Sequence, residues 1–405
     1  MSIIALIGTL DSKGEEFALL KKEIHQRGHE TLVIDVGVLE DPHFQPDITR
    51  DQVARAAGED VALLKEGRDR GKAVAAMTRG VTATIQELHS QNRFQGLMGM
   101  GGTAGTSIAT AAMRALPLGL PKLMISTVAG GDVSGFVGVK DIIMFPSIVD
   151  ISGLNRISRQ VIALAAGAVC GMVETEIPEA EDKPLIAASM FGNTTEAVET
   201  ARARLEEAGY EVLIFHAVGS GGRTMESLIE EGYISGVLDM TTTELADEVV
   251  GGVLSAGPHR LEAAARTGTP AVVAPGCLDM VNFWAPDTVP AEFADRVFYE
   301  HNPNVTLMRT TPGENQVMGK LVADKLNLSE GPVTVYLPLQ GVSVISAPGQ
   351  PFYSPEADEA FREALKSHLR SDISVIAVDA NINDAEFANS AAEALLNLIE
   401  RKGRT

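Results

Sequence analysis

The stretch Gly96 to Ser107, GLMGMGGTAGTS, decides how this chain is expected to fold. It begins as a short apolar strand, passes through a glycine turn at Gly101-Gly102-Thr103, and continues into a helix that reaches Met113. In such a turn the missing side chains let backbone N–H groups approach an anion, and the first-turn amides of the helix favour negative charge. The stretch therefore predicts a phosphate site, for a nucleotide or a sugar phosphate, without naming a reaction.

The N-terminus shows the same pattern of strand, turn and helix. Ile3 to Gly8 is an apolar strand, Thr9 to Gly14 a turn, Glu15 to Arg27 a helix and Thr31 to Asp35 the next strand. Both strands are apolar on both faces, as a parallel sheet covered by helices requires. Asp35 ends the second strand, where nucleotide-binding α/β folds often place an acceptor for the ribose hydroxyls.

The second half of the chain repeats the first. Pro184 to Ser189 is again an apolar strand, and Gly236 to Met240 resembles the strand at Gly96 to Met100. We therefore predict an α/β fold of two Rossmann-like domains with mostly parallel sheets, produced by an internal duplication. The expected domains are residues 1–178 and 184–405, joined by an acidic, proline-containing linker from Glu174 to Pro184.

The composition excludes several classes of partner. The net charge of -21 over 405 residues argues against binding a nucleic-acid backbone, because no dense basic run offsets it. No apolar stretch approaches the length needed to span a membrane, and the N-terminus lacks the basic region of a signal peptide, so we expect a cytoplasmic protein. Cys170 and Cys277 form neither a disulfide framework nor a zinc pattern and are expected to be buried.

The first turn, at the carboxyl edge of the predicted sheet, offers groups that suit a phosphate and its cation. Lys13 would place a point charge on a phosphate, and Asp11 would hold Mg²⁺ through water. The alternative is that Asp11 or Ser12 only caps the helix. For the glycine turn, the alternative is that its glycines only allow the strand and the helix to pack closely, since neither the Walker nor the GxGxxG spacing is present. The predicted nucleotide-binding residues are Gly8, Thr9, Asp11, Ser12, Lys13, Asp35, Gly101, Gly102, Thr103, Gly105, Thr106, Ser126 and Thr127, with Asp11 as the metal ligand.

Other candidates carry weaker signals. A second glycine run, Gly219 to Glu226, also opens a helix and contains Arg223, which can pair a phosphate or a carboxylate. Trp284 could stack a base, contact a subunit or fill the core. No catalytic base can be assigned, although His216 at a strand end is the best histidine. Further polar residues expected near strand ends are Asp132, Asp239, Thr241, Thr242, Thr243, Glu244, Asp279, Asn282, Thr310, Thr311 and Glu314; two further histidines, His259 and His301, show no metal-ligand spacing.

Several motifs in order resemble a known family. They are Gly8 to Glu16, Gly99 to Thr106, Ser126 to Asp132, Asp150 to Asn155 and Asn381 to Asp384. Together they resemble the uncharacterised family related to the N-terminal domain of the tomato mosaic virus resistance protein, over the whole chain. The resemblance implies two Rossmann-like subdomains, ATP with magnesium bound between them, and homodimers. Departures are the serine at Ser12, where threonine is expected, and the loop at Ala129-Gly130. The plant relatives carry a further C-terminal domain, so their role in blocking a viral replicase does not transfer.

The expected function is therefore Mg²⁺-dependent ATP binding, with hydrolysis or phosphoryl transfer left open. Two alternatives remain open on the residues alone: a regulatory module that the nucleotide only stabilises, and an enzyme acting on a nucleotide-sugar or another phosphorylated metabolite.

Overall fold

The computed structural model describes residues 1–178 and 182–403, so the predicted linker falls partly outside the described residues. The chain divides into two compact units, Met1–Glu179 and Ala180–Thr405, which we describe one at a time.

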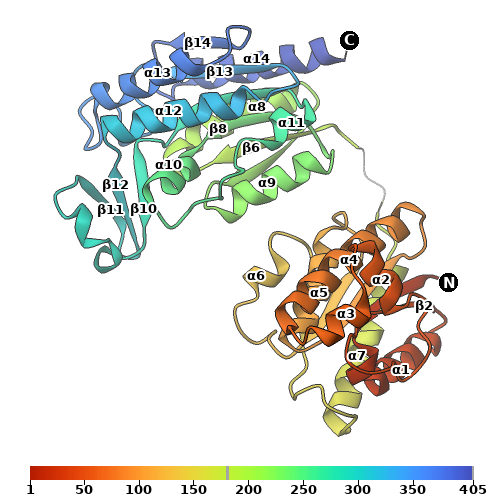
Figure 1. Ribbon diagram of the computed structural model, residues 1–405. Coiled ribbons are helices and arrows are strands. Elements are labelled where there is room, and N and C mark those ends of the chain that lie inside the picture. Colours follow the sequence, from red (N-terminus) through yellow and green to blue (C-terminus); the bar gives the residue numbers. More distant parts are fainter. Residues whose placement is uncertain (179–181, 404–405) are drawn as a thin grey trace. The chain divides into compact units, whose positions relative to one another are not determined.

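The first unit is a five-stranded parallel sheet between two layers of helices (Figure 1). Its strand order is β2-β1-β3-β4-β5. The strands are β1 (Ile3–Gly8), β2 (Glu30–Asp35), β3 (Gly96–Gly101), β4 (Lys122–Ser126) and β5 (Ile143–Pro146). The helices are α1 (Leu10–His25), α2 (Arg50–Ala56), α3 (Val61–Glu66), α4 (Arg70–Ser90), α5 (Thr103–Arg114), α6 (Ser134–Val137) and α7 (Arg156–Glu174).

Each face of this sheet has its own apolar core. Ile85 of α4 and Met113 of α5 pack with β-strand residues such as Leu97 on one face. Phe17 of α1 and Val169 of α7 pack with residues such as Met98 on the other. Leu97 and Met98 are neighbours in β3 and point to opposite faces, which is why the buried strands read as continuous apolar runs.

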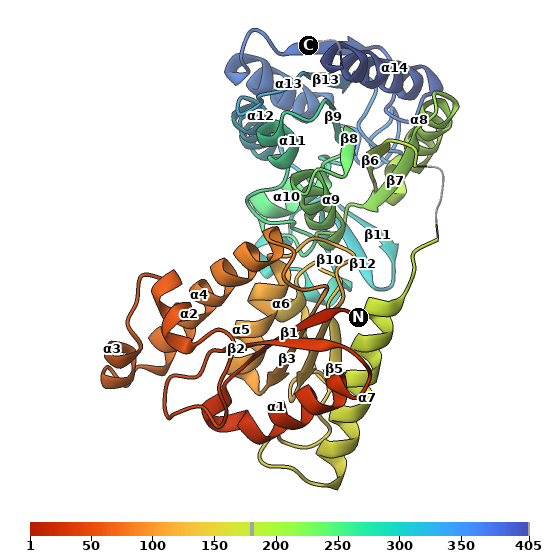
Figure 2. The same cartoon turned by 90° about the vertical axis from the view of Figure 1, so that its right-hand side faces the viewer.

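The second unit contains a six-stranded parallel sheet of order β14-β13-β9-β8-β6-β7. Its strands are β6 (Leu185–Met190), β7 (Glu211–His216), β8 (Ile234–Thr241), β9 (Ala271–Gly276), β13 (Val333–Pro338) and β14 (Ser374–Val378). The helices are α8 (Thr195–Glu207), α9 (Ser220–Glu230), α10 (Thr243–Val250), α11 (Ala263–Thr267), α12 (Pro312–Leu326), α13 (Pro355–His368) and α14 (Ala385–Lys402). Helices α8 and α14 cover one face, and α9 to α13 pack on the other (Figure 2).

A small antiparallel sheet is inserted between β9 and α12. It consists of β10 (Met280–Phe283), β12 (Val305–Arg309) and β11 (Phe298–Asn302) in that spatial order. Short 3₁₀ turns at Pro286–Thr288 and Ala291–Phe293 lie in the loop between β10 and β11. The sequence pattern does not predict this sheet.

The strand orders confirm the predicted fold class and duplication. In chain order, β6, β7, β8 and β9 occupy the positions that β1, β2, β3 and β4 hold in the first unit, and β13 takes the place of β5. The predicted correspondence of Gly96 to Met100 with Gly236 to Met240 is therefore the correspondence of β3 with β8.

Two local predictions need correction. Helix α1 begins at Leu10 rather than at Glu15, with Lys13 in a non-helical conformation inside it, and neither Asp11 nor Ser12 caps it, because Thr9 is the N-cap residue. Helix α7 has 19 residues with mean hydropathy of 1.3, and among the described helices it alone is long and apolar enough to cross a membrane. Its residues Val161, Ala165 and Val169 belong to the first unit's core, which is typical of a core helix.

Both cysteines are free and buried, as predicted.

Candidate functional site

A large cavity lies at the carboxyl edge of the first sheet. Its volume is about 1040 Å³, and all the residues that line it belong to the first unit. They come from the β1–α1 turn, the loop after β2, the segment from α3 to α4, and the first turn of α5. Open α/β sheets bind ligands at this edge, beside the point where the strand order reverses, which here is between β1 and β3.

Helix α5 presents an uncapped first turn to this cavity. Its N-cap residue is Gly102, which has no side chain to accept a hydrogen bond. Within the described part of the chain, the N–H groups of Thr103, Ala104 and Gly105 donate to no protein acceptor. Such N–H groups, together with the helix dipole, favour an anion.

The glycines of this turn divide into two kinds. A Cβ at Gly99 would lie 2.7 Å from the Cβ of Ala109, and one at Gly101 would lie 3.0 Å from the Cα of Gly105. These two glycines are therefore required by the close approach of strand and helix, as the alternative interpretation expected. At Gly102 and Gly105 the nearest protein atom to an added Cβ is 3.7 Å away, which is ordinary contact.

The protein itself therefore has room for a side chain at Gly102 and Gly105. Gly102 has φ of -78°, which any residue adopts, and Gly105 lies inside a helix, where glycine costs about 1 kcal/mol relative to alanine. Packing within the protein therefore does not explain why glycine stands at either position. A ligand that lies close to the backbone would explain it.

The start of α1 places its N-cap residue Thr9 and its first-turn residues Asp11 and Ser12 in the cavity wall. The Asp11 Oδ2 atom accepts hydrogen bonds from the N–H groups of Leu39 (2.9 Å) and Glu40 (3.4 Å), which fixes the loop after β2. A Cβ on Gly37 would lie 2.6 Å from the Asp11 carboxyl carbon, so Gly37 is required for this contact. The Asp11 Oδ1 atom has no hydrogen bond from any described residue.

Lys13 lies apart from these residues. Its Nζ atom donates to the backbone oxygen of Ile151, and Glu16 of the same helix accepts from the N–H of Gly153 at 2.7 Å. Lys13 is not among the residues that line the cavity. The hydrogen bond to Ile151 gives Lys13 a structural role. The predicted role of Lys13 at a phosphate stays a prediction.

Asp35 is fully buried at the end of β2. Its Oδ1 atom accepts from the N–H groups of Gly37 (2.9 Å) and Leu10 (3.1 Å), whereas its Oδ2 atom is buried without a partner among the described residues. Burial raises the pKa of Asp35 above its ordinary value, against the lowering effect of the two N–H groups. Asp35 is not among the residues that line the cavity, and its predicted role at a ribose stays a prediction.

The remaining predicted residues surround the α5 turn. Thr106 and Ser126 are buried and share a hydrogen bond of 2.7 Å between their hydroxyls, and Ser126 also accepts from the N–H of Val128. They join α5 to the end of β4. Thr103 and Thr127 are exposed beside Gly102. At Gly8, an added Cβ would overlap the ring of Phe17, which shows a packing role.

Three cations near the cavity were not identified from the sequence. Lys65 at the end of α3, Arg68 in the following turn and Arg70 at the start of α4 line its wall. Lys65 lies 3.7 Å from Glu40, whereas Arg68 and Arg70 form no ion pair with any described residue. The basic residues of the segment KEGRDR, which runs from the end of α3 to the start of α4, were the available signal, but only the tertiary structure brings this segment to the carboxyl edge of the sheet.

The second glycine run already holds an anion that belongs to the protein. The Glu244 Oε1 atom accepts from the N–H groups of Gly219 (2.7 Å) and Gly222 (3.1 Å) at the start of α9. A Cβ at Gly222 would lie 2.2 Å from Glu244 Oε2, so this glycine is required by the carboxylate. The Arg223 guanidinium donates to the backbone oxygen of Ser255 at 3.2 Å. The two glycine turns thus differ: the turn before α9 is filled by Glu244, and the turn before α5 is open.

Glu244 belongs to a buried ion cluster around Arg260. The guanidinium binds both oxygens of Asp239 at 2.5 and 2.6 Å, Glu244 at 2.6 Å and Glu226 at 3.2 Å. Burial raises the pKa of Glu226, although Arg260 opposes this shift. Since Glu226 also accepts from the N–H groups of Leu261 and Ala263, this cluster holds the loop before α11 in place.

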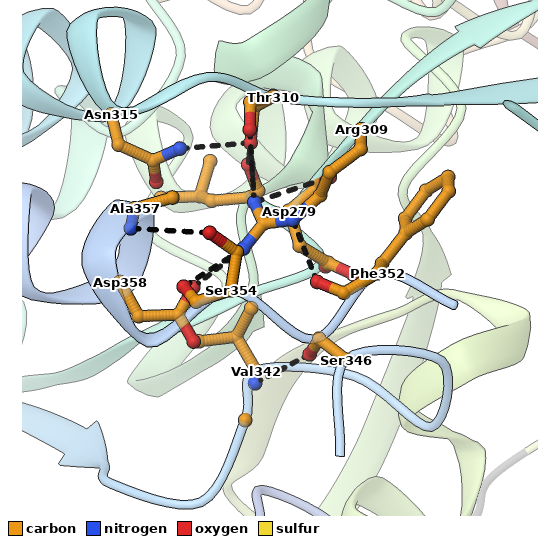
Figure 3. A network of polar contacts seen from close by, with 12 residues as sticks. Asp279, Arg309, Thr310, Asn315, Val342, Ser346, Phe352, Ser354, Ala357 and Asp358 are labelled. Atoms are coloured by element: carbon orange, nitrogen blue, oxygen red, sulfur yellow. Dashed lines mark hydrogen bonds and ion pairs between the residues drawn. The ribbon is translucent and has the colours of Figure 1, made fainter. Parts of the chain in front are cut away.

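A second polar network joins the turn between β9 and β10, the strand β12 and the helix α13 (Figure 3). Arg309 donates to Asp358 at 2.8 Å, to the backbone oxygen of Phe352 at 2.7 Å and to the hydroxyl of Thr310 at 2.8 Å. Asp279 is fully buried beside it and accepts from Ser343 at 2.7 Å, and burial raises its pKa to about 6. The cavity nearby is only about 10 Å³, the size of one water molecule. This network supports loops and offers no ligand pocket.

The other sequence candidates do not meet in one site. The ring of His216 stacks on Phe191 at 5.4 Å, and His259 lies 3.1 Å from Glu262. Thr311 and Glu314 form the capping box of α12, and Asn282 bonds Asp247 and Thr243. Asp132 accepts from the N–H of Ser134. Among the described residues there is no group of three or more His, Cys, Asp or Glu side chains placed to hold a metal ion.

Family models match nearly the whole chain. The N-terminal domain of the uncharacterised protein family UPF0261 matches residues 2–178, and its C-terminal domain matches residues 183–399. The chain belongs to the UPF0261 family.

Relatives within UPF0261 are bacterial and plant proteins. A UPF0261 protein of Clostridium tetani is 50% identical over 98% of this chain and 99% of the relative. A UPF0261 protein of Rhizobium meliloti is 46% identical over 97% of this chain and 98% of the relative. The ToMV resistance protein Tm-1(GCR237) of Solanum lycopersicum is 42% identical over 81% of this chain and 45% of its own length. These matches confirm the resemblance to the tomato mosaic virus resistance protein.

Solved structures similar to this UPF0261 protein are distant. A putative UDP-N-acetylglucosamine 2-epimerase from Listeria monocytogenes has a TM-score of 0.24 and 13% identity, over 67% of this chain and 78% of the other. MurG of Acinetobacter baumannii has a TM-score of 0.22 and 12% identity, over 100% and 99% of the two chains. Likenesses this weak carry no argument about function.

Proposed function

We propose that the first unit binds ATP together with Mg²⁺ in the cavity at the carboxyl edge of its sheet. The observation that carries this proposal is the open first turn of α5, where three N–H groups have no described protein partner and Gly102 and Gly105 leave room for a ligand. A phosphate group would accept from these N–H groups, and the helix dipole would stabilise its charge.

The Mg²⁺ site of the proposal rests on Asp11. Mg²⁺ is usually held by one or two carboxylates together with substrate phosphates and water, so a cage of protein ligands is not required. Asp11 lines the cavity with its Oδ1 atom free of hydrogen bonds from the described residues, while its Oδ2 atom is fixed by Leu39 and Glu40. The residues therefore fit the ion, which would neutralise phosphate charge.

The rest of the cavity suits the other parts of a nucleotide. Val36, Leu39, Val74 and Met77 give it an apolar wall that would contact a base. Arg68 and Arg70 supply cations that no described carboxylate neutralises, and they would bind phosphate oxygens. With a volume of about 1040 Å³, the cavity is large enough for a whole nucleotide.

The proposal is for binding rather than rapid hydrolysis. None of the described residues that line the cavity is a histidine or a cysteine. Of its carboxylates, Asp11 in the first turn of α1 is held by two N–H groups, and Glu40, Glu66 and Asp69 come from the loop after β2 and the segment from α3 to α4. Measuring ADP release from saturating Mg-ATP tests this point. Turnover above one per minute would contradict it and favour a phosphoryl-transfer enzyme.

Calorimetric titration with ATP, ADP and AMP, each with and without Mg²⁺, tests the proposal. We expect affinity to fall from ATP to AMP and to require Mg²⁺ for ATP, because the phosphates make most of the polar contacts. Asp11→Asn should remove most of the Mg²⁺ dependence. Equal affinities for AMP and ATP, or no heat from any nucleotide, would contradict the proposed site. The homodimer implied by the family resemblance remains a prediction for light scattering.

A further inference from the structure

The small antiparallel sheet of the second unit has a pocket of its own. The loop between β10 and β11 covers one face of this sheet, and the rings of Phe283 and Phe293 hold it there with their centres 5.8 Å apart. Between loop and sheet lies a pocket of about 270 Å³. In Figure 1 this sheet lies beside α10, at one end of the second unit.

The walls of this pocket are almost entirely apolar. The loop contributes Pro286, Val289, Pro290 and Ala294, and the sheet contributes Phe298. An engineered cavity of about 150 Å³ lined by apolar groups holds a benzene molecule. A pocket of this size therefore has room for one ring with a short chain.

One polar group of the pocket has no partner. Thr306 lies in the central strand β12, opposite Glu300 of β11 and Phe283 of β10. It lines the pocket and is 2% exposed, and its hydroxyl forms no hydrogen bond with any described residue. A buried hydroxyl without a partner is costly, so a ligand with a hydrogen-bonding group would be stabilised at this position.

The charges around the pocket are negative. Glu300 lines it, is exposed, and has no ion-pair partner among the described residues. The covering loop carries Asp287, Glu292 and Asp295, which also lack one. The nearby cation, Arg296, is bound by both oxygens of Glu314 at 2.9 and 2.7 Å. The pocket therefore favours a positive ligand, and the net charge of -21 raises the local concentration of cations.

We propose that this pocket binds a small organic cation: an amine whose apolar body fills the space under the loop, whose polar group meets the Thr306 hydroxyl, and whose charge lies at Glu300. This site is separate from the nucleotide cavity and does not depend on it. It gives the second unit a ligand of its own, of opposite charge to the ligand proposed for the first.

Three probes with the same ring test the proposal on the full chain. They are 2-phenylethylamine, 2-phenylethanol and 3-phenylpropionate, which differ in the charge of the polar group. Trp284, the single tryptophan of the chain, is two residues from Pro286 and half exposed, so its fluorescence reports on this loop. We expect the amine to bind at least tenfold more tightly than the alcohol, and the acid to bind most weakly.

Two variants separate the contributions. Glu300→Gln should reduce the difference in affinity between the amine and the alcohol to less than threefold. Thr306→Val, which keeps the shape of the side chain, should weaken the binding of both probes by at least threefold. Glu363→Gln, on the exposed side of α13, is the matched control and should bind all three probes as the unmodified chain does. Equal binding of the three probes, no binding of the amine, or unchanged affinity in Glu300→Gln would overturn the proposal.

Discussion

The substitution Gly105→Ala separates a ligand-binding glycine from a structural one. Gly105 is the third residue of α5, and a Cβ added there would meet only the backbone oxygen of Met100, at 3.7 Å. Alanine favours a helix over glycine by about 0.5–1 kcal/mol, so the free energy of unfolding of the first unit should rise by that amount. For a unit of this size, this corresponds to an increase in Tm of roughly 1–4 °C.

The same methyl group should weaken nucleotide binding. It would occupy cavity space next to the free N–H groups, where the proposal places a phosphate. We expect the dissociation constant for Mg-ATP to increase at least tenfold, which is about 1.4 kcal/mol. The variant would thus be more stable and bind less, a combination that general damage to the fold cannot produce.

Gly313→Ala provides a matched control. Gly313 also lies in the first turn of a helix, α12, and a Cβ there would meet no protein atom within 4 Å. This variant should gain similar stability and bind Mg-ATP normally. Thermal unfolding without nucleotide and calorimetry with Mg-ATP measure the two effects. If Gly105→Ala binds Mg-ATP as tightly as Gly313→Ala does, the reasoning about the open glycines is refuted.

Three further predictions follow from the cavity, the buried acids and the filled glycine turn. Arg68→Ala should weaken the binding of ATP by about tenfold and that of AMP by less. Lys72→Ala, outside the cavity wall, should leave the affinities for both nucleotides unchanged in calorimetry. Burial raises the pKa of Asp247 to about 7 and that of Asp279 to about 6, so the folded protein keeps protons that the unfolded chain releases above pH 4. The stability due to these protons is lost as the pH rises through 6 and 7. In urea unfolding, the free energy of unfolding should fall by roughly 3–4 kcal/mol between pH 5 and pH 8. A free energy of unfolding that rises over this range would contradict the assignment. Gly222→Ala should destabilise the second unit by about 2 kcal/mol or more, because its methyl group overlaps the Glu244 carboxylate, and unchanged urea unfolding would contradict this.

The sequence predicts the fold well because its strong signals are local. Apolar runs such as Ile3 to Gly8 are buried on both faces of a sheet, and they appear as strands at nearly the predicted positions. The duplication was visible because β3 and β8 keep similar residues at equivalent places. The strand β11, with the sequence FYEHN, was missed because three of its five residues are exposed and polar, and its pairing with β12 comes from the tertiary structure.

The candidate site was predictable only in part. The glycine turn and the β1–α1 turn lie at the cavity because both follow parallel strands, as the pattern indicates. The pattern could not show that Gly101 is needed for packing while Gly105 is open, since this depends on neighbours across the sheet. Nor could it show that Glu244 fills the second glycine turn, because this carboxylate comes from α10, the helix that follows β8.

A crystal structure of the chain with ATP and Mg²⁺ tests the central claim most directly. The account predicts a phosphate oxygen within hydrogen-bond distance of the N–H groups of Thr103, Ala104 or Gly105, with Mg²⁺ near the Asp11 carboxylate. Phosphates bound away from the first turn of α5, or a cavity without nucleotide at saturating ATP, would contradict it.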